Sequence, residues 1–288
     1  MEAASAALAT QGYLADRPLA LGVHLAVVLE QPLLLEGEAG VGKTEVARAL
    51  AAATGARLIR LQCHEGIDLH HAVYDWDYAR QLLALRAAEG GVDEGQLFSR
   101  RFLLRRPLLD ALEHDGPVVL LIDEIDRADD EFEAFLLEFL SDFAVTIPEL
   151  GTIKASHVPY VVLTSNRTRE IGDALRRRCL YLYIEHPSLE KEVRIIRSRV
   201  PEIDARLAAQ VGRFVQALRT RDLTKPPGVA ETLDWARALV SLHETALDAD
   251  TVEETLGCVL KDQHDIGELD ADAVARLVQE AGQGSEAA

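Results

Sequence analysis

The sequence has few residues of several kinds, and each shortage argues against a class of protein. Its three cysteines, Cys63, Cys179 and Cys258, are odd in number and far apart. They form neither a disulfide framework nor a zinc-binding spacing, which fits a reducing cytoplasm. Basic residues are outnumbered, with 30 Lys and Arg against 48 Asp and Glu and a net charge of −18. This balance argues against a nucleic-acid partner or an anionic-membrane surface.

Long apolar runs are missing as well. No run approaches the ~20 apolar residues that a transmembrane helix needs. The acidic start, MEAASAALATQGYLADR, lacks the apolar core of a signal peptide. We therefore expect a cytoplasmic protein without an integral membrane segment. A hydrophobic share of 48% still provides for a sizeable core, and 288 residues allow one large domain or two small ones.

The segment GEAGVGKTEVARAL contains the spacing G-x-x-x-x-G-K-[ST]. Its glycines allow a tight turn whose N–H groups converge on an anion, and the following helix points its positive dipole end at the same place. Lys43 is expected at the β- and γ-phosphates, and the Thr44 hydroxyl at Mg²⁺. The residues that we expect to bind ATP here are Gly37, Glu38, Ala39, Gly40, Val41, Gly42, Lys43, Thr44 and Glu45.

Strand-like and helix-like segments alternate through the first two-thirds of the chain, which predicts an α/β fold with a parallel sheet. The expected strands are LLLE before the phosphate loop and the segments 57–63, 117–123, 159–166 and 180–185. A helix is expected over 130–142, with Asp129 or Asp130 as its cap. Only helical periods follow Pro187. We therefore predict an ATP-binding core over 1–186 and a small all-helical domain over 187–288.

Two segments interrupt this alternation. The stretch 144–156, AVTIPELGTIKAS, alternates on both sides of PELG and predicts a β-hairpin. The stretch 99–112, SRRFLLRRPLLDAL, combines four arginines with apolar residues at helical spacing. We expect it to form a subunit contact, a contact with the phosphates of a neighbouring subunit's nucleotide, or a plain amphipathic helix, with Pro107 opening a new helix.

Polar side chains end two of the predicted strands. VVLLIDEID ends in Asp123, which we expect to order Mg²⁺ through water, and in Glu124, the expected base for a lytic water. Asn166 ends the next strand and could orient that water, although Asn at a strand end is often a turn residue. Arg176–Arg178 then close a helix directly before a strand. Three cations exceed ordinary dipole compensation in a chain with few positive charges.

In this order of motifs the sequence resembles an AAA+ ATPase, with an αβα nucleotide-binding core and a helical lid. The hairpin resembles the insertion before sensor 1, and residues 64–94 resemble the helix-2 insertion; together they indicate the MoxR-like branch. The closest resemblance is to the subgroup associated with molybdenum carbon monoxide dehydrogenases. It is carried by AVYDWDYARQLL, RADDEFEAFLLEFLSDF, TIPELGTI, VLTSNRTRE and KPPGVAETLDWARAL.

This resemblance implies roles for individual residues. Asn166 matches sensor 1, and Arg178 matches the arginine finger that serves a neighbouring subunit's ATP, with Arg177 as the alternative. Tyr13 and Leu14 lie where the family packs the adenine. The sequence departs from the pattern at sensor 2. Ala230 and Glu231 occupy the positions where an arginine is expected, and Arg237 lies two turns further on.

The resemblance further implies a homo-oligomeric ring, usually a hexamer, and a von Willebrand A-domain partner protein. The activity it implies is an ATP-driven chaperone that matures the metal site of a client metalloenzyme. The alternative is a phosphate-loop kinase of a small molecule, which needs neither a hairpin insertion nor a trans arginine. A DNA-dependent motor is a third hypothesis, against which the acidic balance counts.

Two clusters permit more than one interpretation. Cys63, His64, Asp68, His70 and His71 could bind metal, but their spacing matches no known cage and favours a polar loop. In the following segment, VYDWDY, Tyr74 and Trp76 could contact a client near a pore or could pack the insertion against the core.

Overall fold

The computed structural model describes residues 2–87 and 94–283. The chain forms two compact units, the first made of residues 1–37 and 43–183 and the second of 38–42 and 184–288. The boundary expected between residues 186 and 187 lies close to the last change between units, at residues 183 and 184. Within the described residues, no helix is both long enough and apolar enough to cross a bilayer.

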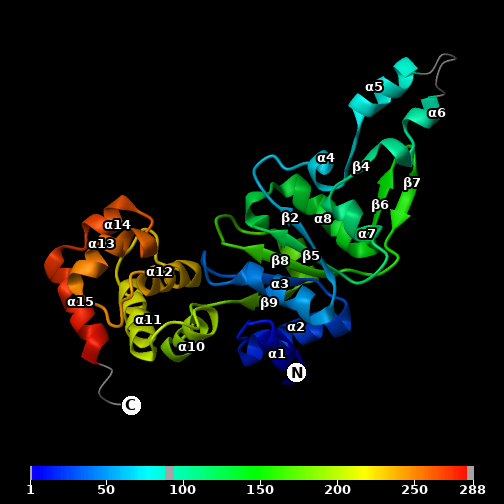
Figure 1. Cartoon of the computed structure of the whole chain (residues 1–288). Coiled ribbons are helices and arrows are strands. Elements are labelled where there is room, and N and C mark those ends of the chain that lie inside the picture. Colours follow the sequence, from blue (N-terminus) through cyan, green and yellow to red (C-terminus); the bar gives the residue numbers. More distant parts are fainter. Residues whose placement is uncertain (1, 88–93, 284–288) are drawn as a thin grey trace. The chain divides into compact units, whose positions relative to one another are not determined.

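A five-stranded parallel sheet forms the centre of the first unit, which confirms the predicted fold class (Figure 1). Its order is β2-β5-β8-β1-β9, and each neighbouring pair is parallel. Because parallel strands end at one edge, the last residues of β1, β5 and β8 meet there. The strands are β1 (Leu33–Glu36), β2 (Arg57–Gln62), β5 (Val118–Asp123), β8 (Tyr160–Ser165) and β9 (Leu180–Tyr183).

Helices of the first unit pack on this sheet. All six residues of β5, VVLLID, are buried, as a strand covered on both faces requires. Helix α3 packs against β5 and β8, α7 against β2 and β5, and α2 against β9 and β1. The helices are α1 (Glu2–Thr10), α2 (Arg17–Leu29), α3 (Lys43–Thr54), α7 (Pro107–Leu112), α8 (Asp130–Asp142) and α9 (Asp173–Arg178).

Helix α8 has the predicted bounds, and Asp129 is its cap because its carboxylate accepts from the Phe132 amide at 2.9 Å. The predicted hairpin is also present. Strands β6 (Ala144–Ile147) and β7 (Gly151–Lys154) pair in antiparallel fashion across the expected turn.

The longer insertion lies between β2 and α7, and its helix α5 reaches away from the sheet (Figure 1). Within it β3 and β4 pair in antiparallel fashion. Part of the stretch expected here, residues 88–93, lies outside the described residues. The elements are α4 (Leu69–Ala72), β3 (Tyr74–Trp76), α5 (Tyr78–Ala87), α6 (Glu94–Leu97), the 3₁₀ turn η1 (Arg100–Phe102) and β4 (Leu103–Arg105).

The helix considered for residues 99–106 is wrong. These residues form η1 and β4 because pairing with Tyr74–Trp76 overrides a helical spacing over so short a stretch. Pro107 does begin helix α7, as predicted.

Trp76 is 6% exposed and packs edge-to-face on Phe98 at 5.3 Å between ring centres, so it packs the insertion against the core.

The helices of the second unit enclose a core of their own, in which the rings of Phe214 and Trp235 lie 5.1 Å apart. Five of them begin at a side-chain cap, supplied by Ser188, Asp204, Asp248, Asp262 and Asp270. The helices are α10 (Leu189–Arg199), α11 (Ala205–Arg219), α12 (Val229–Ser241), α13 (Ala249–Val259), α14 (Gln263–Gly267) and α15 (Ala271–Gln283).

A buried ion pair joins three of these helices. The carboxylate of Glu192 in α10 has no exposed surface and accepts two bonds of 2.7 Å from the Arg219 guanidinium in α11. Gln216 and the Thr232 hydroxyl of α12 donate to the same carboxylate at 2.9 and 3.1 Å. A fully buried carboxylate held by four donors makes this unit dependent on Arg219.

We predict that Arg219→Gln lowers the free energy of unfolding of the second unit by about 3–5 kcal/mol, because the buried Glu192 charge loses its cation. Urea unfolding followed by circular dichroism measures this loss. The matched control is Arg237→Gln, whose pair with Asp234 is exposed and worth less than about 1 kcal/mol. Equal losses in the two variants would contradict the prediction.

Candidate active site

The phosphate loop joins β1 to α3, which begins at Lys43. The Lys43 side chain is 6% exposed and donates to the Gly37 carbonyl at 2.8 Å. Gly42 adopts a φ of 94°, a conformation that residues with a Cβ rarely adopt. The loop therefore has the backbone shape and the buried ammonium that its sequence predicts for a phosphate cradle.

Residues 38–42 contact the start of α12 within the second unit. The Val229 amide donates to the Gly40 carbonyl at 2.9 Å, and a Cβ at Gly228 would lie 2.6 Å from Gly40 Cα. Glu231 caps the Gly228 amide at 3.1 Å. The first turn of α12 thus carries a carboxylate where sensor 2 would place an arginine, and Arg237 pairs with Asp234 instead.

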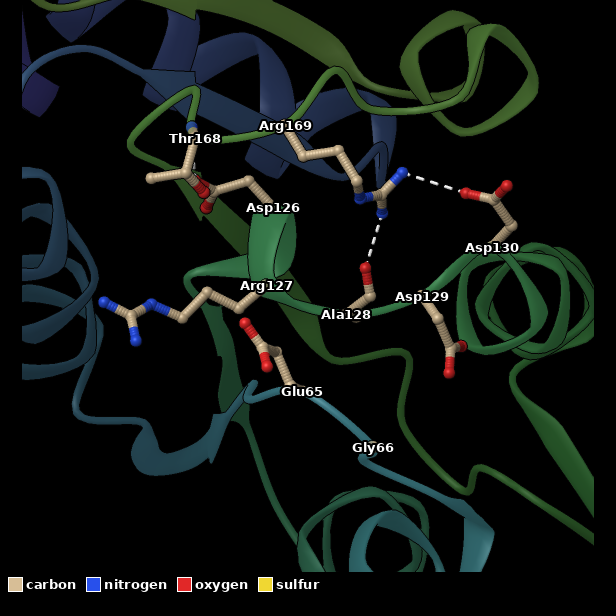
Figure 2. Close-up of a pocket in the computed structure, with 9 residues that line it drawn as sticks. All are labelled: Glu65, Gly66, Asp126, Arg127, Ala128, Asp129, Asp130, Thr168 and Arg169. Atoms are coloured by element: carbon tan, nitrogen blue, oxygen red, sulfur yellow. Dashed lines mark hydrogen bonds and ion pairs between the residues drawn. The ribbon is translucent and has the colours of Figure 1, made fainter.

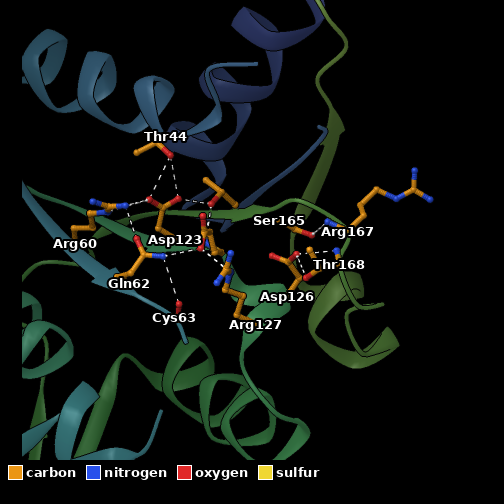
Figure 3. A network of polar contacts seen from close by, with 12 residues as sticks. Thr44, Arg60, Gln62, Cys63, Asp123, Asp126, Arg127, Ser165, Arg167 and Thr168 are labelled. Carbon is orange, nitrogen blue, oxygen red and sulfur yellow. Dashed lines mark hydrogen bonds and ion pairs between the residues drawn. The ribbon is translucent and has the colours of Figure 1, made fainter. Parts of the chain in front are cut away.

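The Asp123 side chain ends β5 and is 3% exposed. It accepts from the Thr164 hydroxyl at 2.5 Å, the Thr44 hydroxyl at 3.1 Å, and Arg60 at 2.6 and 2.9 Å (Figure 3). Hydroxyl and carboxylate oxygens are the ligands that Mg²⁺ prefers, so Thr44 and Asp123 fit a magnesium site. Mg²⁺ bound there would neutralise charge on the nucleotide phosphates.

The next residue, Glu124, lies in the left-handed region with φ 55° and ψ 50°. Its amide donates to the Thr164 hydroxyl at 2.9 Å, so Thr164 contacts both acids. Its carboxylate accepts from Gln62 Nε2 at 3.0 Å and from Arg127 Nε at 2.9 Å. Such unusual backbone conformations persist where the surroundings fix them, as at functional sites.

The loop after β8 carries Asn166 and is tied to the turn after Glu124. The Asp126 carboxylate accepts from the Thr168 amide and hydroxyl at 2.9 and 2.6 Å. Arg169 donates to the Ala128 carbonyl at 2.6 Å. Asn166 directly follows β8 and is partly buried, and its side chain has no hydrogen-bond partner within residues 2–87 and 94–283. The contacts of Asp126 and Arg169 with this loop therefore fix the position of the Asn166 amide relative to Asp123 and Glu124.

Beside these ties lies a pocket of about 600 Å³ (Figure 2). Arg169 crosses it and also pairs with Asp130 at 2.9 Å. The pocket is lined by Glu65, Gly66, Asp126, Arg127, Ala128, Asp129, Asp130, Thr168 and Arg169.

The three arginines that end α9 differ in their surroundings. Arg176 donates to the buried carboxylate of Glu36 at 2.9 Å and lies 5.3 Å from the centre of the Tyr181 ring. It therefore holds β1 and β9 together at the site. Arg177 and Arg178 are exposed, and neither has an ion pair or hydrogen bond of its side chain in the described part of the chain.

Tyr13 lies near the start of α3. Burial, with the nearby carboxylates of Asp16 and Glu45, raises the pKa of its hydroxyl well above the usual range. Glu45 belongs to the first turn of α3, so Tyr13 stands close to the phosphate loop. The adenine contacts expected from Tyr13 and Leu14 stay a prediction.

Cys63 lies in the core of the first unit, where burial raises the pKa of its thiol to about 12. His71 and the Asp68 carboxylate bond to each other at 2.7 Å, and Asp68 also caps α4. The described residues contain no group of three or more His, Cys, Asp or Glu arranged to hold a metal ion.

Residues 32–179, just over half of the chain, match the family model described as AAA domain, dynein-related subfamily. The chain belongs to this family. The matched residues include the phosphate loop, Asp123, Glu124, Asn166 and Arg178. Family membership makes the chain an AAA+ ATPase with ATP and Mg²⁺ as cofactors, and it does not favour the kinase alternative.

Individual relatives are more distant. A ClpA homolog of Fuscovulum blasticum is 28% identical over 186 residues, which are 63% of this chain but only 21% of that protein. An uncharacterised protein of Staphylococcus haemolyticus is 25% identical over 223 residues, covering 75% of this chain and 78% of that one. The Holliday junction branch migration motor RuvB of Thermotoga maritima matches with a TM-score of 0.48 and 17% identity, covering 87% and 70% of the two chains.

Four residues whose side chains contact Asp123 or Glu124 were not predicted from the sequence, namely Arg60, Gln62, Arg127 and Thr164. Arg60 and Gln62 are two residues apart in β2, so their side chains lie on the same face of the sheet. The strand register places Gln62 opposite Asp123. The order β2-β5-β8 places Thr164 beside Asp123 from the other side. A strand order assumed in advance could have identified Arg60, Gln62 and Thr164, whereas Arg127 lies in the turn three residues after Glu124.

We predict that Thr164→Val slows ATP hydrolysis about tenfold or more, because Asp123 loses a donor and the Glu124 amide loses an acceptor, at about 1–3 kcal/mol for each group left unpaired. Steady-state phosphate release at saturating ATP measures this rate. Thr146→Val is the control, since its hydroxyl bonds Thr152 in the exposed hairpin. Unchanged turnover in Thr164→Val would show that Thr164 does not position the acids.

Proposed function

We propose that this ATPase is a MoxR-type chaperone that uses ATP hydrolysis to remodel a protein client. One observation carries the proposal: the same sheet bears both a hairpin insertion, β6–β7, and a long insertion between β2 and α7. A small-molecule kinase needs neither of them. Residues 1–186 would bind ATP, and residues 187–288 would form the helical lid.

We propose a metalloenzyme client resembling molybdenum hydroxylases and carbon monoxide dehydrogenases, together with a von Willebrand A-domain partner, in the cytoplasm. The sequence segments that resemble this subgroup support the assignment. So does helix α5 of the long insertion, where Tyr78, Leu82, Leu83 and Leu85 are exposed to between 41 and 65%. Large apolar side chains on one short helix are suited to contacts with another protein.

The proposed roles in hydrolysis follow the geometry. Lys43 and the loop amides hold the phosphates, and Glu124 accepts a proton from the attacking water. Asn166 orients that water. Family members typically form rings, and we propose a hexamer in which Arg178 reaches the neighbouring subunit's ATP. Two observations support Arg178 in this role. Arg178 is exposed, whereas Arg176 is bound to Glu36 within its own chain.

Capture of the client tests the proposed function. We expect Glu124→Gln to bind ATP but hydrolyse it about 10²–10⁴ times more slowly, because an amide cannot act as the base. Tagged Glu124→Gln protein in lysate of the native cells with ATP should then retain a molybdenum enzyme and a von Willebrand A-domain protein, identified by mass spectrometry. Lys43→Ala, which loses the charge on the phosphates, is the control. Retention of neither protein, or equal retention by Lys43→Ala, would contradict the proposal.

The trans arginine has its own test. Arg178→Ala should bind ATP normally yet lose about 10³–10⁵ in hydrolysis, because the finger stabilises charge that develops in the transition state. Arg177→Ala is the matched control on the next residue. Mixing Arg178→Ala with Glu124→Gln subunits should restore part of the activity, since some interfaces then combine both intact groups. If mixed rings form and stay inactive, Arg178 does not act across the interface.

A further inference from the structure

We propose that Arg60 is a built-in counter-cation of Asp123, which competes with Mg²⁺ for this carboxylate and leaves it when Mg²⁺ binds. The inference concerns the metal site of the ATPase itself. It does not depend on the client, the ring or the partner protein proposed above.

The geometry is that of a strong pair. Nη2 and Nε of Arg60 lie 2.6 and 2.9 Å from the same oxygen, Oδ2 of Asp123 (Figure 3). Hydrogen bonds between charged groups are about twice as strong as neutral ones. The other oxygen, Oδ1, accepts from Thr164, and the Thr44 hydroxyl lies 3.1 Å from Oδ1 and 3.3 Å from Oδ2. The guanidinium therefore binds the carboxylate oxygen that the Thr164 hydroxyl does not contact.

The two partners differ in their freedom to move. The Asp123 side chain is 3% exposed, whereas that of Arg60 is 47% exposed. Asp123 is fixed by its strand and two hydroxyls, but the long Arg60 side chain can turn its charged head into water. An exchange of cations at Asp123 therefore requires movement of Arg60 alone.

Mg²⁺ and Arg60 cannot share this carboxylate without cost. Mg²⁺ holds its oxygen ligands or its waters in a tight octahedron, and a guanidinium 2.6 Å from Oδ2 occupies part of that space. The two positive charges would also repel each other at short range. Arg60 should thus weaken Mg²⁺ binding, while it neutralises Asp123 when no divalent cation is bound.

Departure of Arg60 from Asp123 would also affect the contacts of Glu124, the proposed base. Nη2 of Arg60 donates to Oε1 of Gln62, and Gln62 Nε2 donates to Oε2 of Glu124 at 3.0 Å. One chain of contacts thus runs from Asp123 through Arg60 and Gln62 to Glu124. When Mg²⁺ replaces Arg60, Gln62 loses the partner that orients its amide, and the Glu124 carboxylate becomes less constrained. Arg127 would still hold the Glu124 carboxylate at 2.9 Å, so Mg²⁺ would loosen one of the two side-chain contacts of the base.

The test measures nucleotide binding, not hydrolysis. Affinity for a fluorescent ADP analogue is titrated against Mg²⁺, starting in EDTA. We expect Arg60→Gln to lower the half-maximal Mg²⁺ concentration about tenfold, the equivalent of one charge-assisted hydrogen bond. Arg57→Gln is the matched control, because it removes the same charge from the same strand but pairs with Asp110 at 2.8 Å. Its midpoint should equal that of the unaltered protein.

Arg60→Lys keeps the positive charge but loses the fork, so its midpoint should shift in the same direction by a smaller factor. It also serves if Arg60→Gln unfolds, which circular dichroism would reveal. Added Mg²⁺ and ADP should raise the melting temperature of Arg60→Gln more than that of the unaltered protein. An unchanged midpoint in both variants, or a shift to higher Mg²⁺, would overturn the proposal, because Arg60 would then be neutral toward the metal or would preorganise Asp123 for it.

Discussion

The buried charge of Asp123 is the constraint on which the site depends. A carboxylate on a side chain that is 3% exposed, at the end of a central strand, must be matched by donors, because an unpaired buried charge costs several kcal/mol. The donors come from α3, from β8 and from β2, so three separate elements are fixed around one group. The order of the sheet, with β5 between β2 and β8, is what brings them together.

This arrangement explains why Glu124 can hold an unusual backbone conformation. The Thr164 hydroxyl donates to Asp123 and accepts from the Glu124 amide, so the strand end and the turn after it share one hydroxyl. The left-handed turn then directs the Glu124 carboxylate toward Gln62 and Arg127. The Thr164 hydroxyl thus satisfies the buried Asp123 carboxylate and also fixes the position of the Glu124 backbone.

Patterns local in the sequence predicted much of the fold. The bounds of α8, the β6–β7 hairpin and the strand before Asp123 follow from periodicity, caps and turn residues that lie within a few positions of one another. The helix prediction for residues 99–106 was wrong because the structure of this segment depends on pairing with Tyr74–Trp76, more than twenty positions earlier. A helical spacing over eight residues could not reveal that pairing.

The same difference separates the predicted site residues from the missed ones. Gly37, Lys43, Asp123 and Glu124 are marked by spacing or by a strand that ends in acids. Arg60 and Thr164 carry no such mark, because an arginine or a threonine in a strand is ordinary until the neighbouring strand is known. Their roles come from the sheet order alone.

The arginines of α9 show a further limit of sequence patterns. Three identical residues follow one another, yet Arg176 is bound to the buried Glu36 while Arg177 and Arg178 face outward. Glu36 ends β1, immediately before the phosphate loop, and its charge requires a cation for the same reason as that of Asp123. Of the three guanidinium groups, one therefore stabilises the strand that carries the loop, and two stay accessible to other molecules. Two buried carboxylates at this edge of the sheet, Glu36 and Asp123, thus each take one cation, Arg176 and Arg60, whereas the buried carboxylate of Asp126 accepts from the Thr168 amide and hydroxyl.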